Sequence, residues 1–165
     1  MDEILKRLGL LHPKIIDLKL DRVKRLLRKL GNPEKSIPPV IHVAGTNGKG
    51  STIAMIKSGL QRSGFRTHTY TSPHLVSFNE RIEVGDKRIN EDALKEVLHE
   101  CEKVNKSQPI TFFEITTCAA FLAFSRASAD YTLLEVGLAG EFDATNVVQN
   151  PVALSYPHLT LPTKA

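Results

Sequence analysis

One short segment, residues 42–52 with the sequence HVAGTNGKGST, constrains the fold and function of this chain more than any other. The apolar run at residues 40–43 leads into a turn that holds three glycines and one lysine. Because glycines leave the backbone accessible, successive N–H groups of such a turn can point inward and bind phosphate. Lys49 adds a mobile positive charge, and apolar residues then recur at helical spacing over residues 53–60. The segment therefore predicts a strand, a phosphate-binding loop and a helix, in that order.

The loop departs from the common pattern G-x-x-x-x-G-K-[ST], because it is shorter before the lysine and Gly50 separates the lysine from the serine. An isolated loop of this kind can also be an ordinary turn, since Gly and Asn are frequent in turns. The flanking strand and helix favour phosphate binding. A hydroxyl at the start of the helix can also reach a metal ion between the phosphates. We predict that Lys49 is the catalytic residue of the loop, through its positive charge. We assign ATP binding to the whole loop: Gly45, Thr46, Asn47, Gly48, Lys49, Gly50, Ser51 and Thr52.

An acidic residue ends a later apolar run. Residues 130–136, DYTLLEV, are predicted to form a buried strand with Glu135 near its carboxyl end. In open α/β sheets, ligands bind at the edge where the parallel strands end, which is also the edge expected for the lysine loop. A single Glu at such a position is usually only solvated. Together with a phosphate loop, it is predicted to bind Mg²⁺.

The remaining patterns indicate helices and strands in alternation. We expect helices over residues 14–30, from Asn90 onward and from Thr111 to about residue 124, the last with a capping box formed by Thr111 and Glu114. Strands are expected at residues 66–71 and 150–155, and a hairpin at residues 81–89. This order predicts an α/β fold with a P-loop and a mostly parallel sheet flanked by helices.

Composition excludes several classes of protein. The net charge of +4 in 165 residues is modest, and the basic positions of residues 14–30 have no aromatic residues among them, so we expect no nucleic-acid partner. No apolar run is long enough to span a bilayer, and the first residues lack the features of a secretory signal. Cys101 and Cys118 stand alone and are expected to be reduced and buried. We expect a cytoplasmic monomer that does not bind membranes.

The sequence GTNGKGS after a buried strand resembles the ATP-binding loop of folylpolyglutamate synthases and dihydrofolate synthases, which are relatives of the Mur ligases. The order Lys49-Gly50-Ser51 favours the folate branch, because Mur ligases usually carry Thr directly after the lysine. Four more segments resemble that family, at residues 16–22 (IDLKLDR), 71–74 (TSPH), 111–114 (TFFE) and 135–146 (EVGLAGEFDATN). The resemblance covers residues 12–155 and implies a domain like the central domain of Mur ligases.

The resemblance also implies roles for residues. It implies that Ser72 helps to bind the magnesium ion next to Glu135. The residues that it places against the folate or pteroate are Ile16, Asp17, Leu18, His74, Thr111, Phe142, Asp143 and Ala144. One departure is Ala139, which stands where the family commonly has glycine and restricts the turn if that position needs a positive φ angle.

The family resemblance implies an ATP-dependent ligase with ATP and Mg²⁺ as cofactors. A carboxylate of dihydropteroate or a folate attacks the γ-phosphate to give an acyl phosphate, and the amino group of L-glutamate then displaces the phosphate. Two alternatives stay open at this point. One is a Mur-type ligase that acts on a UDP-linked muropeptide, and the other is a nucleotide-binding module without catalytic activity.

The family pattern also gives an expectation about domains. We expect residues 1–155 to be an ATP-binding ligase domain truncated on its C-terminal side, with an atypical tail at residues 156–165 and no C-terminal ligase domain. His158 follows the last predicted strand too closely to replace the histidine that the family uses as a metal ligand. We therefore expect the isolated chain to bind ATP weakly and to have negligible ligase activity.

Overall fold

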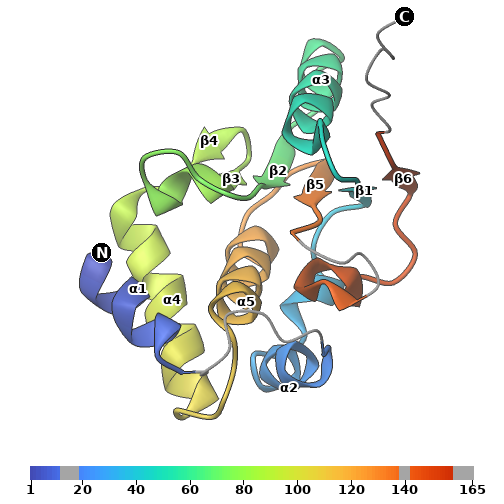
Figure 1. The fold of residues 1–165 in the computed structure, drawn as a ribbon. Coiled ribbons are helices and arrows are strands. Elements are labelled where there is room, and N and C mark those ends of the chain that lie inside the picture. The colour runs from blue at the N-terminus through green and yellow to red at the C-terminus, as the bar shows by residue number, and fades with distance from the viewer. Residues whose placement is uncertain (12–18, 138–141, 158–165) are drawn as a thin grey trace, which may run out of the picture.

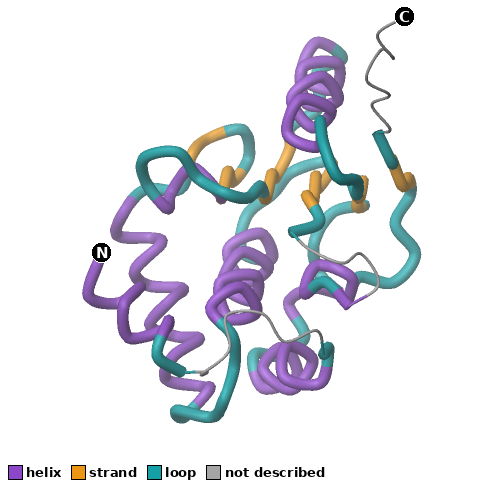
Figure 2. Tube along the Cα trace, viewed as in Figure 1, coloured by secondary structure: helices purple, strands orange, loops and turns teal. Residues whose placement is uncertain are grey.

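A computed structural model describes residues 1–11, 19–137 and 142–157 (Figures 1 and 2). The helices are α1 (Asp2–Gly9), α2 (Asp21–Lys29), α3 (Lys49–Arg62), α4 (Glu91–Asn105) and α5 (Phe112–Ser125). The strands are β1 (Val40–Val43), β2 (Thr67–Tyr70), β3 (Ile82–Val84), β4 (Lys87–Arg88), β5 (Tyr131–Glu135) and β6 (Ala153–Ser155). Short 3-10 helices are η1 (Pro33–Lys35), η2 (Phe78–Arg81) and η4 (Ala144–Val147).

The strands form one mixed sheet in the order β4-β3-β2-β5-β1-β6. Strands β2, β5, β1 and β6 run parallel, and β3 and β4 join the β2 side as antiparallel strands. A turn at Gly85 and Asp86, both with positive φ, connects β3 to β4. The hairpin and the α/β fold class expected from the sequence are therefore confirmed.

Helices cover both faces of the sheet. Figure 1 shows α3 on one face and α5, with α2, α4 and α1, on the other. Side chains alternate along β1, so Val43 packs with Ile53 of α3, whereas Val40 belongs to the larger core on the α5 side. The apolar positions that indicated a helix after the loop thus form the small core between α3 and the sheet.

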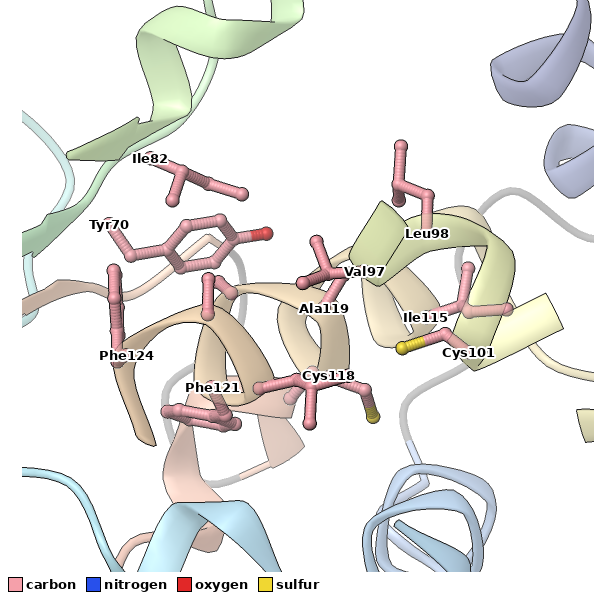
Figure 3. Close-up of a cluster of buried hydrophobic side chains, with 14 of the residues drawn as sticks. Tyr70, Ile82, Val97, Leu98, Cys101, Ile115, Cys118, Ala119, Phe121 and Phe124 are labelled. Carbon is pink, nitrogen blue, oxygen red and sulfur yellow. The ribbon is translucent and has the colours of Figure 1, made fainter. Parts of the chain in front are cut away.

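Helix α5 lies at the centre of the larger core. Its residues from Glu114 to Phe124 are all buried, because the sheet, α2 and α4 surround it. Figure 3 shows side chains of β2, β3, α4 and α5 in one cluster, including Tyr70, Phe121 and Cys101. Both cysteines are buried and unpaired, as expected.

The structure confirms the predicted starts of the helices that begin at a capping residue. Asn90 caps α4 by accepting a hydrogen bond from the Ala93 N–H, and the capping box at Thr111 begins α5. In the N-terminal region, α2 begins at Asp21, and residues 12–18 of the expected helix lie outside the described residues. Helix α1 was not predicted. Among the described parts of the chain, none of the helices has the length and apolar character needed to cross a bilayer.

Candidate functional site

The lysine loop joins the end of β1 to the start of α3. Helix α3 begins at Lys49, two residues before the expected start, and Gly48 caps it in the left-handed region at φ 76°. Gly45 has φ 138°, and a Cβ atom there would lie 3.0 Å from the carbonyl oxygen of Pro157. Glycine at position 45 therefore satisfies both a conformational and a steric requirement. Pro157, from the start of the expected tail, lies directly against the loop.

The loop presents polar groups to solvent. Thr46, Asn47 and Ser51 are exposed, and the first N–H groups of α3 have no partners within their own helix. The Thr52 hydroxyl donates to the Gly48 carbonyl at 2.9 Å, which stabilises the first turn. Of the two hydroxyls considered for a metal ion, that of Ser51 is thus the more accessible.

The register of the sheet brings Glu135 to this loop. Val43 at the end of β1 pairs with Glu135 at the end of β5. The Lys49 Nζ atom consequently lies 3.7 Å from Glu135 Oε1. Both side chains are largely shielded from solvent. The expected meeting of lysine and carboxylate at one edge of the sheet is present in the structure.

Ser72 lies at the same edge, just after β2. Its backbone N–H donates to Glu135 Oε2 at 3.1 Å, so Lys49 and Ser72 contact different oxygens of one carboxylate. Burial raises the pKa of Glu135, while the Ser72 N–H and the charge of Lys49 lower that pKa, and the net shift is upward. The carboxylate is therefore held in a partly desolvated site next to the loop.

The donor set suits a magnesium ion bound with a nucleotide. The described residues contain no group of three or more His, Cys, Asp or Glu side chains able to hold a metal by themselves. Mg²⁺ usually binds through one or two carboxylates together with phosphate oxygens and water. One carboxylate, from Glu135, with Ser72 in contact through its backbone fits this pattern, because the phosphates supply the missing oxygens.

Three residues meet at the start of α5. Thr111 is buried, its hydroxyl accepts from the Glu114 N–H at 3.2 Å, and its own N–H donates to Glu114 Oε2 at 2.7 Å. The guanidinium of Arg22 on α2 donates to both oxygens of Glu114, at 3.0 Å each. Sequence reasoning did not single out Arg22 as a site residue. Its only sequence signal was its position at the end of residues 16–22, which resemble a segment of the folate ligases.

The other candidate residues for substrate contact lie in different environments. Phe142 is 48% exposed, whereas Asp143 and Ala144 are buried. Asp143 Oδ1 accepts from the N–H of Thr145 at 2.9 Å and from its hydroxyl at 2.6 Å. Of these three positions, Phe142 is therefore the one with a readily accessible side chain.

Thr145 continues this network to the nucleotide loop. Its Oγ1 atom lies 2.8 Å from Nε2 of His42 on β1, three residues before Gly45 begins the loop. Because the Thr145 hydroxyl donates to Asp143, His42 Nε2 acts as the donor to Thr145. Burial lowers the pKa of His42, with an opposing contribution from Asp143. Sequence reasoning missed His42, since a histidine in a buried strand gives no local signal of its partner.

His74 belongs to the loop between β2 and η2. Its Nδ1 atom accepts from Arg81 Nε at 2.8 Å, and its ring contacts Phe78 edge-on. In the same loop Leu75 and Val76 are 93% and 89% exposed, while the Glu80 carboxylate accepts from their N–H groups. The backbone of this loop is therefore fixed even though its apolar side chains face solvent.

Several residues with predicted roles lie outside the part of the chain that the structure describes. These are the proposed substrate contacts Ile16, Asp17 and Leu18, the unusual Ala139, and His158 with the rest of the tail after Pro157.

No protein-family model matches this chain, but curated proteins and solved structures are similar to it. The chain is 44% identical over 138 residues to a dihydrofolate synthase/folylpolyglutamate synthase of Bacillus subtilis, covering 79% of this chain and 32% of that protein. It is 42% identical over 144 residues to a protein of the same name from Escherichia coli, covering 87% and 34%. The chain spans about a third of the length of these curated relatives.

Solved structures show the same similarity. E. coli FolC in complex with DHPP and ADP superposes with a TM-score of 0.89 at 38% identity, over 97% of this chain and 38% of that chain. The bifunctional folylpolyglutamate synthase/dihydrofolate synthase with Mn, AMPPNP and L-glutamate bound has a TM-score of 0.83 at 34% identity, over 92% and 36%.

Proposed function

This chain is a relative of the folylpolyglutamate synthases/dihydrofolate synthases, and from that premise we propose that it forms the ATP-binding part of a ligase that joins L-glutamate to a folate or dihydropteroate. Residues 1–155 make up this ATP-binding unit. The relatives reported above are named for folate substrates, which supports a folate over the UDP-linked muropeptide considered from the sequence.

The observation that carries the proposal is the cluster of Lys49, Glu135 and Ser72. The three residues lie at the ends of three neighbouring strands: Glu135 is the last residue of β5, Ser72 follows β2, and Lys49 follows the loop after β1. Two contacts, at 3.7 Å and 3.1 Å, hold Lys49 and Ser72 at the Glu135 carboxylate. A flexible cation, an N–H-rich loop and one desolvated carboxylate are the groups that a magnesium-bound triphosphate needs. The solved relatives with ADP or with Mn and AMPPNP support this assignment.

In the proposed reaction, the loop residues 45–52 bind the phosphates of ATP and Lys49 stabilises charge on the transferring γ-phosphoryl group. When bound, Mg²⁺ supplies further neutralisation of the phosphate charges, held by Glu135 with Ser72 close by. A carboxylate of the folate attacks the γ-phosphorus and ADP leaves, which gives an acyl phosphate. The amino group of L-glutamate then attacks the acyl carbon and inorganic phosphate leaves.

The folate site is proposed to lie between the start of α5 and the segment before η4. Phe142 supports this placement because its ring is half-exposed and available to a pteridine. His74 and Thr111, together with Ile16, Asp17 and Leu18, complete the proposed contacts. Asp143 and Ala144 are proposed to act mainly by shaping this wall, since both side chains are buried.

Nucleotide binding to the 165-residue chain tests the assignment. Isothermal titration with ATP should show an affinity that depends on Mg²⁺, and Lys49→Ala should weaken ATP binding by about tenfold or more, the expected effect of losing a charge-assisted contact. Lys103→Ala is the matched control, because it removes an exposed lysine of α4. Equal ATP affinity in the Lys49 and Lys103 variants would contradict the proposal.

We further propose that the protein is a cytoplasmic monomer. The two buried, unpaired cysteines support a reducing compartment. Light scattering after size exclusion would detect a dimer and so refute the monomer.

A further inference from the structure

The nucleotide loop has an entrance, where it leaves β1, and an exit, where α3 begins. At the exit, the Gly48 carbonyl accepts hydrogen bonds from the N–H and from the hydroxyl of Thr52, both at 2.9 Å. These bonds stay within the first turn of α3. At the entrance, the Ala44 N–H donates to the Ser155 carbonyl at 2.9 Å. The entrance of the loop therefore depends on β6, which pairs with β1 but lies far along the chain (Figure 1).

Pro157 follows β6 and packs against the first residue of the loop. Gly45 has φ 138°, and a Cβ atom there would lie 3.0 Å from the carbonyl oxygen and 3.4 Å from the Cγ and Cδ atoms of Pro157. Because glycine lacks this atom, the two residues can approach closely. The next two residues, Thr46 and Asn47, are exposed. Pro157 thus limits the movement of Gly45 just before the loop enters solvent.

Proline suits such a support better than other residues. Its ring fixes its own φ angle and also restricts the residue that precedes it, here Tyr156. The segment that leaves β6 is therefore stiffer than it would be with another residue at position 157. A loop that is held in place before its ligand arrives loses less conformational freedom on binding, and this strengthens binding.

We propose that Pro157 is a positioning residue of the nucleotide site. It holds Gly45 so that the N–H groups of the loop are arranged for phosphate before the nucleotide binds, and it acts through Gly45 instead of touching the nucleotide. The identity of the ligand rests on the proposed function. The proposal adds to residues 1–155 a contact from the segment that was expected to be only an atypical tail.

Backbone dynamics of the ¹⁵N-labelled 165-residue chain test the proposal without a ligand. Pro157→Gly removes the ring and its φ restriction, so the order parameter of the Gly45 N–H should fall from a rigid value of about 0.85 toward the flexible range below about 0.6. Pro151→Gly is the matched control, because Pro151 precedes β6, at the end of that strand away from the loop. It should leave Gly45 unchanged. Equal order parameters in the wild type and Pro157→Gly would overturn the proposal.

Binding of two ligands shows what this support contributes. Mg-ATP is compared with Mg-tripolyphosphate, which lacks the base and the ribose. Pro157→Gly should weaken both by about tenfold and by the same factor, because ordering one backbone residue costs about that much. Pro157→Ala keeps the carbonyl oxygen but loses the ring, and it should show an intermediate loss. Pro151→Gly should leave both affinities within about twofold of the wild type.

Several results would count against the positioning role. Unchanged affinities in Pro157→Gly would refute it, and equal losses in the two glycine variants would show a general weakening of β6. Tighter binding by Pro157→Gly would show that Pro157 obstructs the loop. A loss for Mg-ATP alone would place Pro157 at the base.

The proposed function fails in a different way. A wild-type chain that binds neither ligand refutes the nucleotide assignment, and the order parameter of Gly45 still decides whether Pro157 holds the loop. A wild-type chain that binds both ligands no better than Pro157→Gly refutes the positioning role alone.

Discussion

The Nζ atom of Lys49 lies 3.7 Å from the Oε1 atom of Glu135, at the edge where β1 and β5 end. The contact joins the first residue of α3 to the last residue of β5. The contact holds a mobile cation beside a desolvated carboxylate, and Thr46, Asn47 and Ser51 of the loop stay exposed to solvent. This is why the pair is assigned to ligand binding as well as to packing.

Glu135→Gln is expected to stabilise the fold at neutral pH while weakening binding of Mg-ATP. Because burial raises the folded-state pKa of Glu135 above its ordinary value of 4.5, ionisation disfavours the folded state as the pH rises through that folded pKa. The variant removes this penalty and also removes the magnesium ligand. Thermal unfolding should give a higher Tm than wild type at pH 7 and no gain at pH 4. A gain of the same size at both pH values would contradict the pKa argument.

Gly45→Ala is expected to destabilise the chain by about 1–2 kcal/mol, because an alanine is strained at positive φ. At this position the new methyl group would also lie 3.0 Å from the Pro157 carbonyl oxygen. Gly59→Ala is the matched control in the interior of α3, where nothing lies within 4 Å of the added Cβ. This control should stabilise the chain by about 0.5–1 kcal/mol through helix propensity. Urea unfolding of both variants measures the difference, and equal effects would be incompatible with the loop geometry.

The buried histidines predict a loss of stability in mild acid. Burial lowers the folded-state pKa of His42 and of His68 below the ordinary value of 6.5. The stabilisation from each neutral ring is therefore complete above pH 6.5 and is lost as the pH falls through its folded pKa. His42→Gln should lower the free energy of unfolding at pH 7.5. Below pH 6.5, the free energy of unfolding of this variant should fall less steeply with decreasing pH than that of the wild type. Unfolding free energies measured from pH 7.5 to 5 would show this change, and an unaltered slope would argue against it.

Breaking the pair between α2 and α5 should be costly. Glu114→Gln removes the negative charge that faces the largely buried guanidinium of Arg22, and we expect a loss of about 3 kcal/mol. Thr111→Ala removes only the cap and should cost about 1 kcal/mol, whereas Thr111→Ser should be nearly neutral. Chemical denaturation of the three variants checks this ranking. A cost for Glu114→Gln no larger than that for Thr111→Ala would show that the ion pair contributes little.

Much of the local structure was predictable from short-range signals. The glycine turn at residues 45–50 indicated the loop because few other sequences allow positive φ and an accessible backbone together. The start of α4 followed from Asn90 and that of α5 from the capping box, since a cap satisfies backbone groups within three residues of itself. Helix α1 escaped prediction because its residues lack a comparable start signal: Met1 makes no side-chain cap.

The sequence by itself determined the main strands, the helices from α2 onward, the turn between β3 and β4, and the lysine loop that precedes α3, but it did not predict α1. Only the tertiary structure decided which of these elements meet. The pairing of β1 with β5 brings Glu135 to Lys49, and the packing of α2 on α5 brings Arg22 to Glu114. Periodicity and caps act within a few residues, whereas partners far apart in sequence are set by strand order and by the core that covers the sheet. The same reason explains why Asp143, expected at the substrate, is buried against Thr145.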